Sequence, residues 1–161
     1  MPKRRYNTQL FALPAPPPRE VCVGGVTYEL VRVFKHDFFA ATALYEAVGS
    51  TGVSPIPEIV VKTYRTQPFF GLAMEWLGRF SREHEKAIYA ALEGVAGVPR
   101  CLGCVGQTGL AIEYIKAVPL DHFDPVPAGY FDRMRQILDA VHARGVAYVD
   151  ANKLSNMLVG P

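Results

Sequence analysis

Val141–Val159, which reads VHARGVAYVDANKLSNMLV, is the stretch that decides how this chain is interpreted. A helix-like run ends at Gly145, and Asp150, Lys153 and Asn156 follow before apolar residues resume. Glycine often ends a helix in the left-handed conformation, so we expect a loop to begin here. A carboxylate, an ammonium and an amide on one loop can orient a proton, offset charge and bind a cation, although Asp and Asn are also common turn residues. The stretch therefore predicts a loop with a chemical role at the end of a helix.

Upstream of this loop, the spacing of apolar residues predicts an α+β fold. Alternating or β-branched apolar residues predict short strands at 26–34, 42–48, 58–65, 100–106 and 109–115. Apolar residues at steps of three to four or their multiples predict a helical region over 71–97, which Gly78 can divide, and a helix over 131–142. The apolar stripe of the first helical region consists of Leu72, Trp76, Phe80, Ile88 and Leu92. We therefore expect an antiparallel sheet of five strands with the first helical region packed on it.

Two charged residues stand out within these elements. Lys62 lies inside the third predicted strand. Glu85 lies three residues before Ile88 and seven before Leu92, so it shares their inward-facing side of the helix. A carboxylate in that place needs a partner, and Lys62 is the candidate. Glu83 is the alternative to Glu85, but it aligns less well with the apolar stripe.

The order of these features carries a family resemblance. A strand with a lysine, a helix with a glutamate, a strand that ends in Glu113-Tyr114 and a helix that ends in His142-x-x-Gly145 precede the Asp-containing loop. This order resembles the eukaryotic-type protein serine/threonine kinases, including their bacterial members, over residues 26–159. The resemblance implies a protein kinase-like α+β fold. Its N-lobe would be an antiparallel five-stranded sheet with one main helix, followed by the start of a helical C-lobe.

The resemblance implies an ATP site formed by the strands and the first helix. Lys62, held by an ion pair to Glu85, would contact the α- and β-phosphates of ATP. The backbone from Glu113 to Ile115 would connect the lobes and bond adenine. A single strand lysine is more often only a solvated residue, so the order with Glu85 and the loop is what supports this role.

The loop after the second helix would supply the catalytic groups. By the same resemblance, Asp150 would orient the proton of an attacking hydroxyl, Lys153 would offset charge on the transferred phosphoryl group, and Asn156 would hold Mg. The Lys and the Asn follow the Asp by three and six residues, one more than the family's usual two and five. Tyr148 stands where the family commonly has His. The acceptor would be an unidentified hydroxyl-bearing protein or small molecule.

Two parts of the kinase pattern are missing from the sequence. The segment 34–42, FKHDFFAAT, spans the expected wide hairpin tip but has no glycine, so it gives no support to phosphate binding by its amides. No Asp-Phe-Gly follows Asn156. Because kinases neutralise the transferred group with Mg held by that Asp and the loop Asn, we expect an incomplete, C-terminally truncated catalytic region that is inactive as given. The alternative is a non-catalytic nucleotide-binding or protein-binding module of pseudokinase type.

Cys101 and Cys104 form a C-x-x-C pair, which can be half of a zinc site or a redox motif. Zinc needs four ligands, and Cys22 is the one further thiol. Buried strand or turn cysteines are therefore the favoured interpretation. A small interaction protein with a zinc-held turn is a third possible function.

The sequence divides into three parts. Residues 1–20 hold a basic cluster and several prolines, and we expect a Pro-rich leader arm that behaves as a solvated tail, with a docking peptide or a nucleic-acid-binding arm as the alternatives. Residues 21–115 would be the kinase-like N-lobe and hinge, and residues 116–161 the partial C-lobe. The apolar stripe of the second helix would be partly uncovered, which favours self-association. This stripe consists of Phe131, Met134, Leu138 and Val141.

Composition and charge narrow the possible partners. Half of the 161 residues are apolar, and 17 basic against 15 acidic residues give a net charge of +2. This charge is too small to indicate nucleic-acid or membrane partners, and no apolar run is long enough to span a bilayer. Three cysteines are too few for a disulfide framework. We therefore expect a globular cytoplasmic protein with no nucleic-acid or membrane partner.

Overall fold

The computed structural model describes residues 10–49, 56–149 and 154–160. The chain forms two compact units, of which the first combines residues 1–87 with 101–114 and the second combines residues 88–100 with 115–161. The chain leaves the first unit for the last time after Tyr114.

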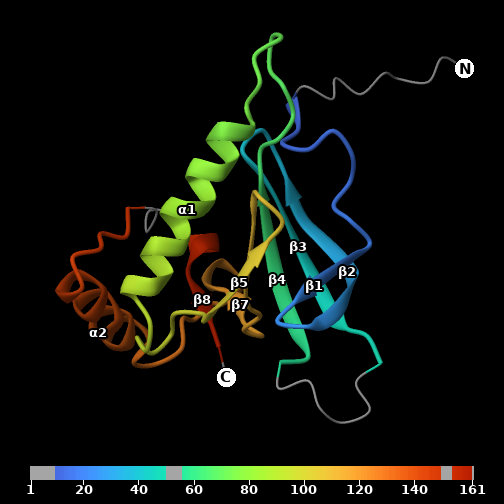
Figure 1. The fold of residues 1–161 in the computed structure, drawn as a ribbon. Helices are drawn as coiled ribbons and strands as arrows, with labels where there is room; N and C mark the ends of the chain where they lie inside the picture. Colours follow the sequence, from blue (N-terminus) through green and yellow to red (C-terminus); the bar gives the residue numbers. More distant parts are fainter. Residues whose placement is uncertain (1–9, 50–55, 150–153, 161) are drawn as a thin grey trace, which may run out of the picture. The chain divides into compact units, whose positions relative to one another are not determined.

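The first unit is built on a curled antiparallel sheet (Figure 1). Its six strands lie in the order β1 (Glu20–Val23), β2 (Val26–His36), β3 (Ala40–Ala47), β4 (Glu58–Tyr64), β6 (Gly109–Glu113) and β5 (Cys101–Val105). Strand β1 also lies close to β5, so the two edges of the sheet approach each other. Valine, isoleucine and tyrosine, which favour strands, recur in these segments.

The sheet has one strand more than the sequence predicted. Val21 of β1 lies opposite Tyr28 of β2, and the turn between these strands contains Gly24 and Gly25 with φ angles of 58° and 81°. A two-residue turn of this kind needs positive φ at both positions, which glycine adopts without strain. The prediction of five strands is therefore wrong. A Gly-Gly pair between two apolar segments is the hairpin signal that would have shown the sixth.

The core of this unit lies inside the curl of the sheet. It consists of Val21, Val23, Tyr28, Ala43, Tyr45, Ile59, Val61 and Ala111. Burial of large apolar side chains stabilises a fold by about 1.5–3 kcal/mol each. Because successive strand residues point to opposite faces, Lys62 and Tyr64 lie on the other face of β4 from Ile59 and Val61. Helix α1 packs on that other face.

Helix α1 (Glu75–Ala91) approaches the end of β4 through Gly78. A Cβ atom at position 78 would lie 2.3 Å from the carbonyl oxygen of Arg65 and 3.1 Å from Cγ2 of Thr108. Only a residue without a side chain allows this approach. Gly78 therefore does not divide the helix but lets an unbroken helix pack closely. Trp76 and Phe80, which were predicted on its apolar stripe, are exposed.

Residues 10–19, the leader segment, belong to the predicted leader arm and pack against the sheet. Ala12 and Leu13 are buried beside Ala41 of β3. The amide of Ala12 donates to the carbonyl of Asp37 at 2.7 Å. The expectation of a solvated tail is wrong for this segment, because apolar residues beside the prolines give it a surface to bury. The rest of the predicted arm lies outside the described residues.

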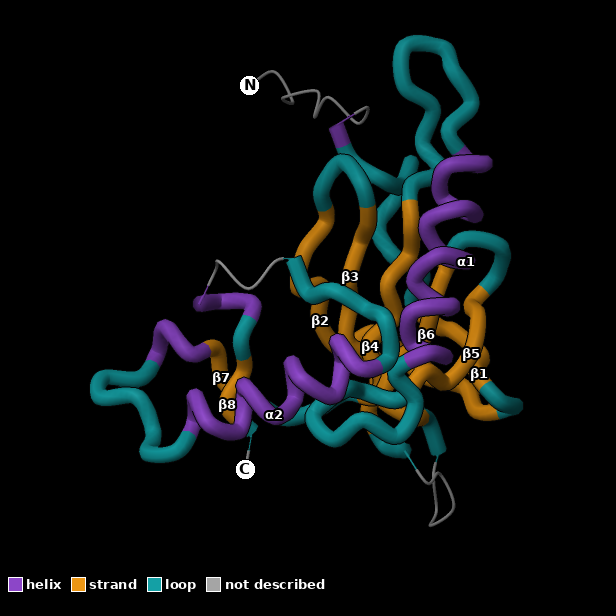
Figure 2. Tube along the Cα trace, turned by 90° about the vertical axis from the view of Figure 1, so that its left-hand side faces the viewer, coloured by secondary structure: helices purple, strands orange, loops and turns teal. Residues whose placement is uncertain are grey.

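The second unit has its own small apolar core, which joins the end of α1 to helix α2 (Tyr130–Ala143). Leu92, Val95 and Val141 are buried together, with Ile137 packed against them. Figure 2 shows α2 in this unit with the short pair β7 and β8. The shorter elements are β7 (Val118–Pro119), η2 (Leu120–His122), η3 (Leu154–Asn156) and β8 (Leu158–Val159), with β7 antiparallel to β8.

The apolar stripe of α2 is unevenly covered. Val141 is buried and Met134 and Leu138 are half-buried, whereas Phe131 is 61% exposed. Helix α2 itself begins one residue before the predicted start and ends one residue after the predicted end. Within the described residues, every helix is too short or too polar to cross a bilayer.

Candidate functional site

Lys62 lies at the centre of the sheet, on a strand that is flanked by β3 and β6. Its ammonium Nζ lies 2.6 Å from Oε2 of Glu85 on α1. The side chains are 36% and 22% exposed, so solvent screens the pair and limits its contribution to stability to about 1 kcal/mol at most. The predicted ion pair is confirmed. The alternative partner, Glu83, pairs instead with Arg82.

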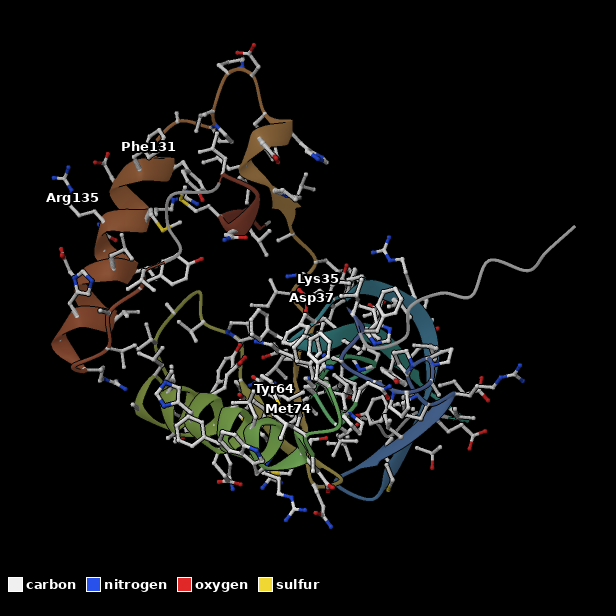
Figure 3. The ribbon with its side chains drawn as sticks, turned by 90° about the horizontal axis from the view of Figure 1, so that it is seen from above. Lys35, Asp37, Tyr64, Met74, Phe131 and Arg135 are labelled. Atoms are coloured by element: carbon white, nitrogen blue, oxygen red, sulfur yellow. The ribbon has the colours of Figure 1, made fainter. Side chains whose placement is uncertain are left out.

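Tyr64, whose side chain is labelled in Figure 3, is a third member of this site, and sequence reasoning missed it. It follows Lys62 by two residues on β4, so both side chains leave the same face. Its hydroxyl donates a hydrogen bond to Oε2 of Glu85, the oxygen that also binds Lys62. The Lys62 ammonium lies 5.0 Å from the centre of the Tyr64 ring, within the range of cation–π attraction. The i, i+2 spacing in the strand was the signal that could have found Tyr64.

The tip of the β2–β3 hairpin, residues 37–39, is narrower than predicted and is closed by its own carboxylate. Oδ1 of Asp37 accepts hydrogen bonds from the amides of Phe39 at 2.9 Å and Ala40 at 3.0 Å. Oδ2 lies 2.6 Å from the ammonium of Lys35, and Figure 3 shows these two side chains together. Burial acts to raise the pKa of Asp37, but the bonds from Lys35 and the two amides outweigh it and lower the pKa below its usual value. These amides are therefore already engaged by an anion.

Arg65 follows β4 directly and is buried, with 1% of its surface exposed. Its Nη1 donates to the carbonyls of Phe38 at 2.8 Å and Phe11 at 3.2 Å, and its Nη2 to that of Pro68 at 3.3 Å. The guanidinium lies 4.0 Å from the centre of the Phe38 ring. Burial lowers the pKa of Arg65, but an arginine keeps its charge under ordinary conditions. One side chain thus fixes the hairpin tip, the leader segment and the loop after β4.

The predicted hinge is the place where the chain leaves the first unit. Glu113 is the last residue of β6, and Ile115 begins the final part of the second unit. Between them, the amide of Tyr114 donates to the carbonyl of Glu58 at 3.4 Å. The Tyr114 ring lies 6.2 Å from that of Phe34. These contacts hold the end of β6 to the sheet, and the adenine role of Glu113 and Ile115 stays a prediction.

The predicted catalytic loop is described only at its two ends. Asp150 and Lys153 lie outside the described residues. Tyr148 precedes these residues and Asn156 follows them, and the hydroxyl of Tyr148 donates to the carbonyl of Asn156 at 3.2 Å. Within residues 10–49, 56–149 and 154–160, no group of three or more His, Cys, Asp or Glu is placed to hold a metal ion.

Cys101 and Cys104 lie on β5, opposite Ile112 and Leu110 of β6. Both are half-buried free thiols. They are strand residues, as the favoured interpretation of the C-x-x-C pair expected.

Comparison with known proteins does not assign the chain to a family. No protein-family model matches it, and a search of curated proteins gives no significant match. Hypotheses about its function depend on its own residues and their geometry.

Proposed function

We propose that this chain is a protein kinase-like, ATP-binding region of a phosphotransferase that acts on a hydroxyl of a protein or small molecule. The observation that supports it is the Lys62–Glu85 ion pair, which joins the centre of the sheet to α1. The arrangement around the pair adds support. A curled antiparallel sheet carries one helix between β4 and β5, and β6 ends at the candidate hinge.

The chemistry of Lys62 suits a phosphate ligand. An ammonium has three N–H donors, so one bond to Glu85 leaves donors that can bind phosphate oxygens. Glu85 fixes the position of the ammonium in advance, which reduces the ordering needed when the ligand binds. The remaining roles follow the resemblance alone. They are adenine binding for Glu113 and Ile115, hydroxyl orientation for Asp150, charge compensation for Lys153 and Mg binding for Asn156.

A non-catalytic nucleotide-binding module is the second candidate, and the hairpin tip favours it. The amides of Phe39 and Ala40 bind the carboxylate of Asp37, so a phosphate would have to displace that carboxylate to reach them. Without these amides, Lys62 and the hinge would hold the nucleotide. Such binding does not fix the γ-phosphate in line with an acceptor, and transfer depends on that alignment.

We also propose a cytoplasmic location. Cys22, Cys101 and Cys104 are free thiols, as expected in a reducing compartment.

Titration calorimetry with ATP and Mg tests the proposal. Lys62→Met should weaken ATP binding about tenfold or more, because charge-assisted hydrogen bonds contribute about 1.5–3 kcal/mol. The melting temperature should change little, because the ion pair is partly exposed. Lys86→Met, at an exposed position of α1, is the matched control and should bind ATP like the wild type. Equal affinity of wild type and Lys62→Met would remove the phosphate role.

Transfer from labelled ATP to generic acceptors separates the two candidate functions. Transfer that disappears in Asp150→Asn would support the phosphotransferase. ATP binding without transfer, in both the wild type and Asp150→Asn, is expected of the non-catalytic module and also of an incomplete catalytic region, so only Asp150-dependent transfer decides between them.

A further inference from the structure

Tyr64 occupies a fixed place beside the Lys62–Glu85 ion pair. It is buried at the end of β4, and its amide donates to the carbonyl of Thr108 at 2.9 Å. Its cross-strand neighbour on β3 is Ala40, a small residue that leaves room for a ring. A tyrosine side chain has only two torsions, so the strand largely determines where its hydroxyl lies. That hydroxyl contacts Glu85 of α1.

Oε2 of Glu85 therefore has two donors of different kinds. The Lys62 ammonium is charged, sits on a long side chain and is partly exposed. The Tyr64 hydroxyl is neutral and belongs to a buried ring. When a phosphate attracts the ammonium, a carboxylate held by Lys62 alone could follow it. A second donor that is fixed to the sheet keeps Glu85 where it is.

We propose that Tyr64 is a positioning residue whose hydroxyl anchors Glu85, so that the Lys62–Glu85 pair is already formed before a nucleotide binds. This role rests on the proposed ATP site at Lys62. A preformed pair raises the apparent affinity for ATP, because the competent state is populated without the ligand. Tyr64→Phe is the sharpest variant, since it keeps the ring beside the Lys62 ammonium and removes only the bond to Glu85.

The test combines ATP affinity with a double-mutant comparison. Tyr64→Phe should weaken ATP binding severalfold in the wild-type background and should have no further effect in the Lys62→Met background, because Tyr64 acts through Lys62. Tyr45→Phe is the matched control. Tyr45 is also a buried tyrosine of this sheet, and its hydroxyl donates to the carbonyl of Pro18 at 2.9 Å. It should reduce stability by a similar amount and leave ATP affinity unchanged.

A direct signature of the contact makes the test independent of nucleotide binding. A hydroxyl proton of a buried ring that is bonded to a carboxylate should give a downfield, slowly exchanging proton resonance in NMR spectra. This resonance should be present in the wild type and absent in Tyr64→Phe, and it should shift in Glu85→Gln.

The outcomes distinguish the two proposals. Equal ATP affinity of wild type and Tyr64→Phe, or equal weakening by Tyr64→Phe and Tyr45→Phe, overturns the positioning role. A wild-type chain that binds no ATP overturns the proposed function. The hydroxyl resonance alone then decides whether Tyr64 anchors Glu85. Its loss in Tyr64→Phe together with its shift in Glu85→Gln upholds the anchor on Glu85. A spectrum without it overturns the anchor.

Discussion

At the scale of single residues, His36 joins the leader segment to the β2–β3 hairpin. Its Nε2 accepts the amide hydrogen of Leu13 at 3.2 Å, and its ring lies 4.9 Å from that of Phe11. Burial lowers the pKa of His36 below its usual value of 6.5, although Asp37 acts to raise it. An imidazole nitrogen accepts a hydrogen bond only when it carries no proton, so this contact requires neutral His36.

We expect the docking of the leader to weaken as the pH falls. A histidine whose pKa is lowered by docking binds more protons when undocked. The docked state therefore loses stability below about pH 6.5, and the loss levels off below the lowered pKa. The measurement is the protection factor of the Leu13 amide in hydrogen exchange, between about pH 7.5 and pH 5.5. In His36→Gln the pH dependence should disappear, and a flat wild-type profile would contradict the prediction.

Individual site residues were predictable where the spacing of nearby apolar residues placed them on a strand or on one face of a helix. Lys62 on a strand and Glu85 on the inward face of a helix follow from two periodicities, and the ion pair between them is confirmed. Arg65 was not found, because an arginine at the end of a strand is usually exposed. Its burial depends on carbonyls of Phe11 and Phe38, which are distant in the sequence. No local pattern contains such a contact.

At the scale of elements, the close approach of α1 to β4 gives a prediction with an unusual sign. In a free helix, Gly→Ala is stabilising by about 1 kcal/mol. Here we expect Gly78→Ala to lower the free energy of unfolding by about 1–3 kcal/mol, because overpacking displaces a backbone that cannot move freely. The atom in the way is the carbonyl oxygen of Arg65, 2.3 Å from the added Cβ.

Urea denaturation gives this free energy directly. Ala87→Gly, at an exposed position of the same helix, is the control and should cost about 1 kcal/mol through helix propensity alone. A more stable Gly78→Ala would show that the helix is not held at this distance.

The elements themselves were largely predictable, and the errors have physical causes. The two helices and the strands from β2 to β6 follow the apolar periodicity. Strand β1 was missed because its hairpin signal lies next to a proline-rich segment, which indicates extended, solvated chain. Periodicity also predicted that Trp76 would face inward. Periodicity shows which residues share a face of a helix, but not which face packs on the sheet. Here Gly78 and its neighbours in space decide that, and Trp76 is exposed.

At the scale of the whole molecule, large apolar residues remain exposed in each unit. Phe70 is 79% exposed and has φ of 48°, in a segment from Gln67 to Met74 without a charged residue. In the second unit, Phe131 is exposed at the start of α2. Exposed aromatic residues of this kind favour association.

We expect concentration-dependent self-association in sedimentation velocity. Phe131→Asp should reduce self-association if the apolar stripe of α2 is the contact, as the sequence suggested. Phe70→Asp should reduce it if the segment from Gln67 to Met74 is the contact. Val31→Asp, at an exposed position of β2, should leave association unchanged. A strictly monomeric wild type at all concentrations would rule out both contacts.

The buried Arg65 also sets an order of events during protein synthesis. Phe11 is 54 residues from Arg65, so a ribosome adds most of the sheet before the partner of the Phe11 carbonyl exists. The β1–β2 and β2–β3 hairpins need only neighbouring residues and can pair on the emerging chain. Ala12 and Leu13 stay uncovered until the β2–β3 hairpin brings Ala41 beside them. This segment is therefore made before β1 to β4, and its bond to Arg65 can form only after these four strands have been made.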